Sequence, residues 1–216
     1  MRRRRHGLFT SRLLAWILIP AFGVLFAPCR PAEAGKQPLP QSVDQSAVRR
    51  PPGTMVVTVT DDIIRLGGGI SRALPGALDA ILDRHPQVRT VLLDSPGGEV
   101  LGSLSTAELI RRRGLNTMVP FNSDCASACV ILLAGGVERR VAPGTKVGVH
   151  AWRYAKPVTD EVVERDASVL RAAFVKFGIS GEIVDLMQST PNQQVRWLTH
   201  QQMRDLRLIT NEIAGN

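Results

Sequence analysis

The chain has 216 residues, with 27 basic and 19 acidic side chains, so its formal net charge is +8. Most of that excess lies at the start: residues 1–34 hold six arginines and one glutamate, which leaves +3 for the remainder. A nucleic-acid-binding protein needs a basic stripe in its folded part. The run RRRG at 111–114 is too short for one, so we expect no nucleic-acid partner.

Residues 1–34 have the organisation of an export signal. A basic leader precedes a mostly apolar run at 13–28, and Ala32 and Ala34 give the small-x-small pattern of a signal peptidase site. We therefore expect cleavage after Ala34 and a periplasmic protein. The alternative is a retained anchor facing the periplasm, the only case in which we expect a membrane contact. Anchors usually need about 20 apolar residues, which this run does not reach.

The rest of the chain divides into a linker and one domain. Residues 35–53 are rich in Pro, Gln and Ser and poor in large apolar groups, which predicts a disordered linker. Residues 54–216 are long enough for one substantial hydrophobic core. We find no internal repeat in them.

The hydrophobic pattern of this domain predicts strands and helices in alternation. In chain order we expect a strand at 55–59, a strand at 61–70 that runs into a glycine turn, a helix at 74–85, a strand at 90–93, a helix at 101–114, a strand at 116–121, a buried helix at 128–136, two short strands around a Pro-Gly turn within 139–152, a long helix at 159–178, a helix at 199–208 and a last strand at 209–213. Strands separated by helices predict an α/β domain with mainly parallel pairing.

The long predicted helix bears on assembly. Thr159 is its expected N-cap, and acidic residues occupy its first turn. An apolar band should run along it, made of Val162, Val169, Ala172, Ala173 and Phe177. If the helix projects, this band needs another subunit, and a closed homo-oligomer is the usual result. If it folds back onto its own sheet, the protein is a monomer.

The stretch SDCASACV at 123–130 raises the question of chemistry. Ser127 opens the buried helix, either as a nucleophile or as a small residue in a tight turn. A serine nucleophile needs a base, and His150, at the end of the apolar strand KVGVH, is best placed among the four histidines. Its alternative reading is a half-buried histidine bonded to a backbone carbonyl. Oxyanion donors could come from the helix start at Ala128, and the Gly97–Gly98 pair allows a substrate backbone to approach closely.

Cys125 and Cys129 are the only cysteines left after cleavage at Ala34. In an oxidising compartment they could form a disulfide, because residues four apart at a helix start are within reach of each other. Regular helix geometry aims the two side chains poorly, which leaves the free thiols equally open. Two thiols without a nearby histidine fall short of a zinc site, so we expect no metal. We expect no cofactor, and no phosphate-binding loop is present for ATP.

These residues carry a family resemblance over about 62–152, and more loosely beyond. The shared features occur in order: SPGG at 95–98, a T-x-V strand at 117–119, an SA pair at 127–128 opening an apolar helix, a G-x-x-x-R turn at 135–139 and a strand ending at His150. The chain resembles the proteolytic subunit of the Clp protease, and is most similar to exported ClpP-like proteins described as predicted periplasmic proteins. The resemblance implies a ClpP/crotonase-like fold, with a projecting handle helix through which subunits pair. It also implies a Ser127 nucleophile, a His150 base and oxyanion-hole amides from Gly97 and Ala128.

One element of the family pattern is missing. Where the family has the acid of its catalytic triad, this sequence has Thr190 or Pro191. Asp185 is the nearest carboxylate, and a dyad assisted by a hydroxyl or carbonyl is the alternative. The resemblance thus implies an ATP-independent exported serine peptidase acting on extended or unfolded peptides. The competing function is a catalytically impaired pseudoenzyme that serves as an assembly or binding module. Acyl-CoA chemistry is disfavoured, because CoA is scarce outside the cytoplasm.

Overall fold

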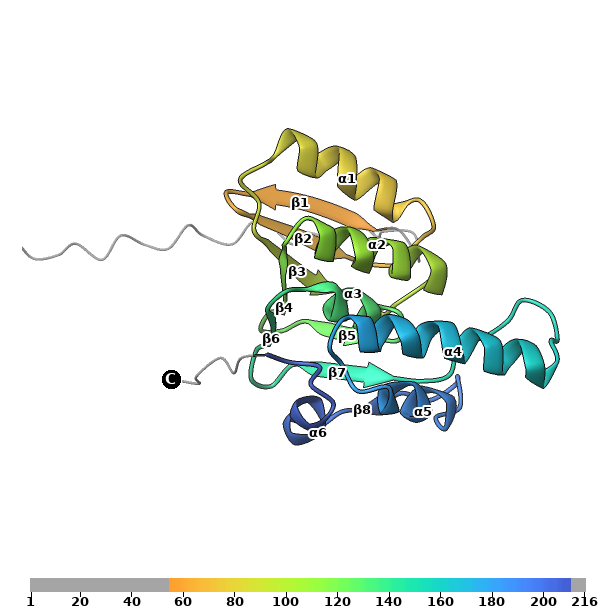
Figure 1. Cartoon of the computed structure of the whole chain (residues 1–216). Helices are drawn as coiled ribbons and strands as arrows, with labels where there is room; N and C mark the ends of the chain where they lie inside the picture. The colour runs from red at the N-terminus through yellow and green to blue at the C-terminus, as the bar shows by residue number, and fades with distance from the viewer. Residues whose placement is uncertain (1–54, 211–216) are drawn as a thin grey trace, which may run out of the picture. The chain divides into compact units, whose positions relative to one another are not determined.

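The computed structural model describes residues 55–210 (Figure 1). The predicted export signal and linker, and residues 211–216, lie outside this part. The first two strands form a hairpin, in which β1 (Val56–Thr60) pairs antiparallel with β2 (Ile63–Gly67). Asp61 lies in the tight turn between them with a positive φ of 50°, as such turns require.

The larger sheet continues from this hairpin with three parallel strands. They are β3 (Thr90–Asp94), β4 (Asn116–Val119) and β6 (Arg139–Val141), and the strand order is β1-β2-β3-β4-β6. The connections are the helices α1 (Leu74–Arg84), α2 (Val100–Arg112) and α3 (Cys129–Gly135). Helix α2 packs against both α1 and α3. Every residue of α3 is buried, as its uniformly apolar sequence predicts.

A second, smaller sheet lies beside the first and has the order β5-β7-β8. Its strands are β5 (Asp124–Ala126), β7 (Lys146–Val149) and β8 (Arg196–Trp197). β5 and β7 are parallel, and β7 and β8 are antiparallel. A parallel bridge between Ser95 and Cys125 joins the end of β3 to β5, which connects the two sheets.

Three further helices follow: α4 (Asp160–Lys176), α5 (Glu182–Gln188) and α6 (His200–Asp205). Thr199 and Gln202 form a reciprocal capping box at the start of α6. Thr159 stands at the N-cap of α4 as expected, but its side chain makes no capping hydrogen bond. Within residues 55–210, no helix combines the length and apolar character needed to cross a membrane.

Helix α4 keeps part of its apolar surface exposed. Its buried residues are Ala167, Leu170 and Phe174, whereas Val169 and Val175 are 56% and 58% exposed. Of the apolar band expected from the sequence, only Phe177, just past the end of the helix, is buried. The expected face is therefore not the one that packs on this domain, because the covered stripe is rotated around the helix.

Most predicted elements are confirmed, with four differences. The first is that helix α5 was not predicted. The strand expected at 209–213 is wrong for its first two residues, which are not in a strand, and the others lie outside the described residues. The two strands expected within 139–152 both exist as β6 and β7, but they belong to different sheets. β5 and β8 were not predicted, because both are very short and lack an alternating pattern.

Arg139 of β6 holds the end of the domain in place. It is only 4% exposed, and its guanidinium donates to the backbone carbonyls of Gly136, Arg207 and Leu208 at 2.9–3.1 Å. The Arg139 amide and carbonyl also bond to Thr210. Burial, together with the nearby Arg111 charge, lowers the pKa of Arg139 to about 10, so the side chain still carries its charge at neutral pH.

We expect Arg139→Gln to lower the free energy of unfolding by about 3 kcal/mol, because it leaves buried carbonyls without donors. For a domain of this size the melting temperature should fall by roughly 6–12 °C, measured by calorimetry. Arg140→Gln is the matched control: this neighbour is exposed and, among residues 55–210, pairs with Glu138 alone, so the loss should stay below about 1 kcal/mol. Equal effects of the two substitutions would contradict the role of Arg139.

Candidate active site

The pairing of β5 with β7 places Ser127 at the centre of the candidate site. Ala126, the last residue of β5, pairs with Gly148 of β7. The next amide, that of Ser127, donates to the Gly148 carbonyl at 2.9 Å. The backbone then turns sharply into α3, and Ser127 adopts a positive φ of 57°. This left-handed conformation costs a non-glycine residue about 1–2 kcal/mol, and a strained strand-to-helix turn is a known way to expose a nucleophilic serine.

The SPGG turn lies against Ser127, and its two glycines allow the close approach. A Cβ on Gly97 would lie 2.7 Å from Cβ of Ser127, and one on Gly98 would lie 2.1 Å from the Ile70 carbonyl oxygen. Both glycines also have a positive φ, of 103° and 150°. A side chain on Gly97 would therefore push the turn away from Ser127, whereas one on Gly98 would push it away from the backbone of Ile70.

The backbone amides near Ser127 differ in their availability. The Gly97 amide, which the resemblance assigned to the oxyanion hole, donates to Ser95 Oγ at 3.1 Å. The Ser127 amide is engaged by Gly148. Within residues 55–210 the amides of Gly98 and Ala128 make no hydrogen bond. Ala128 is the N-cap of α3, where unpaired amides are expected. The geometry thus leaves Gly98 and Ala128 as the free donors.

His150 immediately follows β7 and is half-buried. Its Nδ1 lies 2.8 Å from the carbonyl oxygen of Ala151. Because a carbonyl only accepts, Nδ1 carries the hydrogen in this contact, and in the neutral tautomer Nε2 has the lone pair. The Ala151 amide in turn donates to the Thr190 carbonyl at 2.8 Å. Thr190 therefore supports the histidine segment through its backbone, while its hydroxyl donates to Leu186.

Asp185 is not joined to His150 by any hydrogen bond in the described part of the chain. It lies on α5 with its side chain 60% exposed, and Arg171 donates to it at 2.8 Å. That hydrogen bond lowers the pKa of Asp185. This carboxylate is engaged elsewhere, so the histidine has a backbone carbonyl where a triad would have an acid.

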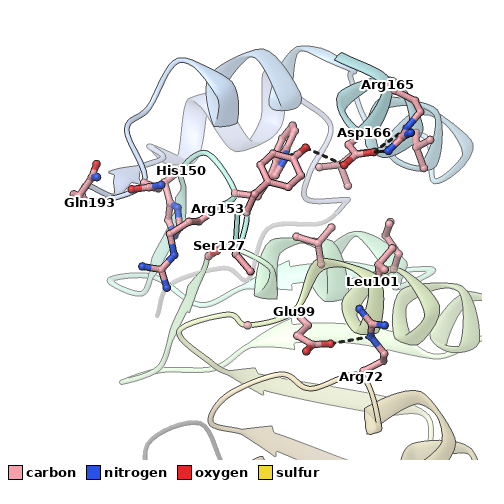
Figure 2. A pocket seen from close by; sticks show the side chains of 18 residues that line it. Arg72, Glu99, Leu101, Ser127, His150, Arg153, Arg165, Asp166 and Gln193 are labelled. Atoms are coloured by element: carbon pink, nitrogen blue, oxygen red, sulfur yellow. Dashed lines mark hydrogen bonds and ion pairs between the residues drawn. The ribbon is translucent and has the colours of Figure 1, made fainter. Parts of the chain in front are cut away.

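Ser127 and His150 line one cleft of about 1260 Å³. Figure 2 shows the two side chains facing this space from neighbouring chain segments. No hydrogen bond joins Ser127 Oγ to either ring nitrogen among the described residues. An apolar wall of the cleft is formed by Leu101, Leu104, Trp152, Val169 and Leu170. The cleft exceeds the usual size of a small-molecule pocket and suits an extended chain.

A hydrogen-bonded chain of side chains ties the segment after His150 to α4. Trp152 Nε1 donates to the Tyr154 hydroxyl at 2.8 Å, and that hydroxyl donates to Asp166 at 2.9 Å. Arg165 also donates to Asp166. Burial raises the pKa of Tyr154, and the Tyr154 hydrogen bond lowers that of Asp166. No pattern in the sequence indicated this connection through Trp152, Tyr154 and Asp166.

Cys125 and Cys129 are joined by a disulfide in the structure, with Cα atoms 5.3 Å apart. Both cysteines are fully buried, one on β5 and one at the start of α3. Regular helix geometry does not hold between them, because the chain passes through the left-handed turn at Ser127. The turn brings the two sulfurs together, so the crosslink closes directly around the candidate nucleophile. Among the described residues no cluster of side chains could hold a metal ion.

Comparison with known proteins supports the fold. The sequence matches no family model and no curated protein. Among solved structures, the chain is similar to a serine-to-alanine mutant of the 1510-N membrane-bound stomatin-specific protease, with a TM-score of 0.52 and 14% identity. The match covers 69% of this chain and 77% of that one. The fold is ClpP/crotonase-like. At this identity the similarity shows the architecture alone, and the chemistry of this ClpP-like domain has to be argued from its own residues.

We expect the Cys125→Ala/Cys129→Ala double variant to lose about 2 kcal/mol of unfolding free energy, the loop-closure entropy of a short crosslink. The melting temperature should fall by about 4–8 °C in thermal denaturation. Dithiothreitol under mildly denaturing conditions should lower the native melting temperature to that of the double variant and leave the double variant unchanged. A native protein insensitive to reductant in this assay would contradict a stabilising disulfide.

Proposed function

We propose that the protein is an exported, ATP-independent serine peptidase that cleaves peptide bonds through an acyl-enzyme on Ser127. The observation that carries the proposal is the strained turn at Ser127, flanked by two free amides and sharing a cleft with His150. The similarity to a solved structure of a protease agrees with this activity.

In the proposed first step, Ser127 Oγ attacks the peptide carbonyl carbon while its proton passes to His150 Nε2. The carbonyl oxygen becomes an oxyanion and accepts hydrogen bonds from the amides of Ala128 and Gly98. Gly98 replaces Gly97 in this role because the Gly97 amide is already bonded to Ser95. The C–N bond then breaks, and His150 returns the proton to the leaving amine.

Deacylation repeats these steps with water as the nucleophile. His150 Nε2 takes a proton from water, the new C–O bond forms, and Ser127 leaves as the alcohol with that proton. The whole cycle uses protein groups and water, so we propose no cofactor, metal or nucleotide. The required tautomer of His150 is the one favoured by the Ala151 carbonyl.

The proposed enzyme should be slow. A backbone carbonyl orients the imidazole but stabilises the imidazolium less than a carboxylate would, because it carries only a partial charge. In a serine protease, replacing the acid by an amide costs about four orders of magnitude in turnover. We place this protein between that limit and a complete triad. The open, mostly apolar cleft fits extended or unfolded peptides as substrates.

We expect a fluorophosphonate probe to label the protein at Ser127. Ser127→Ala and His150→Ala should each reduce the labelling rate by at least about 100-fold, because the nucleophile or its base is lost. The labelled peptide is identified by mass spectrometry after digestion. Ser123→Ala is the matched control, since this buried serine of the same motif contacts Arg65 instead of the cleft. Persistent labelling of Ser127→Ala would remove the nucleophile assignment.

The second candidate function is a catalytically impaired ClpP-like module that assembles or binds peptides. The observation in its favour is the missing hydrogen bond between Ser127 and His150, together with the absence of a carboxylate bonded to His150 within residues 55–210. The same probe experiment separates the two functions. A folded native protein that takes up no probe, yet binds unfolded peptides, would establish the second one.

We also propose that the mature protein begins at Gly35 in the periplasm and assembles through α4. Native mass spectrometry of protein purified from the cell envelope should give a trimer, hexamer or larger ring of subunits that lack residues 1–34. The exposed side chains of Val169 and Val175 support the assembly. Val175→Glu should dissociate it, whereas Phe121→Glu, equally exposed but outside α4, should not. A mass equal to that of one chain would contradict the proposed assembly. Subunits that start at Met1 would contradict the proposed cleavage.

A further inference from the structure

The charged side chains of the cleft are paired, with one exception. Arg72 forms an ion pair with Glu99 at 3.2 Å, and Arg165 forms one with Asp166 at 3.0 Å. Arg153 lines the same cleft, is exposed, and has no ion pair or hydrogen bond to any described residue. The described lining of the cleft therefore carries one uncompensated positive charge.

The backbone around Arg153 directs this charge toward the nucleophile. Side chains two residues apart on an extended segment share one side, and the side chain between them points to the other. Trp152 and Tyr154 bond to each other and, through Asp166, to α4. Arg153 accordingly lies away from α4, and Figure 2 shows it beside His150 and Ser127, with Asp166 across the cleft.

The hydrogen bonds made by its neighbours restrict where Arg153 can lie. An arginine on an unrestrained loop would sample many positions. Here the residues on both sides of Arg153 are half-buried and held by side-chain hydrogen bonds. The start of this segment is held as well, since the Ala151 amide bonds to Thr190. The backbone at Arg153, three residues after the proposed base His150, is thus held in place.

We propose that Arg153 binds a carboxylate of the peptide substrate next to the scissile bond, which gives the enzyme a preference for acidic peptides. The inference rests on the proposed peptidase function and deepens it. A guanidinium presents paired donors that match the two oxygens of a carboxylate. The carboxylate can be an acidic side chain or the free C-terminus of the peptide. The two carboxylates that line the cleft, Glu99 and Asp166, are already paired with Arg72 and Arg165.

The size of the effect follows from exposure. Solvent-exposed ion pairs contribute little, whereas a charge-assisted pair that a bound chain shields from water contributes more. A partly shielded pair corresponds to about a 5- to 20-fold preference for Glu over Gln in kcat/KM. The preference should shrink as salt is raised, because screening weakens a partly exposed pair.

The test uses fluorogenic peptides that carry Glu or Gln at each of three positions on either side of the scissile bond. A second pair ends in a free acid or an amide, which separates a side-chain carboxylate from a terminal one. We expect one arm to show the preference in the native enzyme. Arg153→Gln should abolish it, Arg153→Lys should keep part of it, and Arg153→Glu should favour Lys in the same peptide.

Arg84→Gln is the matched control, because this exposed arginine ends α1 outside the cleft and its loss changes the net charge equally. It should leave the Glu-to-Gln ratio unchanged. The inference is overturned if no arm shows an acid preference, or if the preference persists in Arg153→Gln.

The same peptides should also be measured as ligands of Ser127→Ala by fluorescence anisotropy. We expect the acidic peptide to bind about 5- to 20-fold more tightly than its Gln form, and Arg153→Gln in this background to remove the difference. Binding without an acid preference would overturn the inference. Because this readout needs no turnover, failure of the peptidase proposal and failure of the Arg153 proposal remain distinguishable.

Discussion

The candidate site depends on one backbone hydrogen bond, from the Ser127 amide to the Gly148 carbonyl. It continues the pairing of β5 and β7 by one residue, so that the ends of the two strands stay side by side. Ser127 leaves β5 and His150 leaves β7 within two residues of this bond. Because the Ser127 amide is used in this way, the oxyanion of the proposed reaction needs other donors. The strained turn, the SPGG contact and the disulfide all lie around this one point.

The support of His150 comes from backbone groups and not from a carboxylate. The Ala151 carbonyl orients the imidazole, and the Thr190 carbonyl orients Ala151. In the resemblance described above, the acid of the triad corresponds to Thr190 or Pro191. The Thr190 backbone still lies next to the histidine segment, through its bond to the Ala151 amide, but its side chain carries no charge. A site built this way loses electrostatic stabilisation of the imidazolium but retains the correct tautomer. In a triad, one acidic residue both orients the histidine and stabilises its positive charge. Here a backbone carbonyl supplies the orientation without the full negative charge.

The sequence predicted the larger elements for identifiable reasons, and the two residues that it selected as candidates, Ser127 and His150, line one cleft. Helix α3 is apolar on every side, and β3 is a short aliphatic run followed by Pro-Gly-Gly. Both elements can therefore be predicted from the local sequence pattern. β5 was missed because three residues cannot show a period. Two hydrogen bonds could not be predicted, because side-chain positions do not follow from sequence spacing. The Gly97 amide donates to Ser95, and Arg171 donates to Asp185. The same holds for the chain from Trp152 to Asp166, whose members have no sequence signature.

The position of Arg139 has a consequence for when this domain can fold. Its guanidinium, buried at the start of β6, donates mainly to the carbonyls of Arg207 and Leu208, almost seventy residues further along the chain. Until those residues emerge, burying Arg139 would leave its charge with only the nearby Gly136 carbonyl as an acceptor among the described contacts, at a cost of several kcal/mol. While the chain is being synthesised or exported, β6 therefore stays in contact with water. The core around it forms only once Arg207 and Leu208 are available as acceptors. The segment that contains Arg207 and Leu208 therefore controls the completion of this domain.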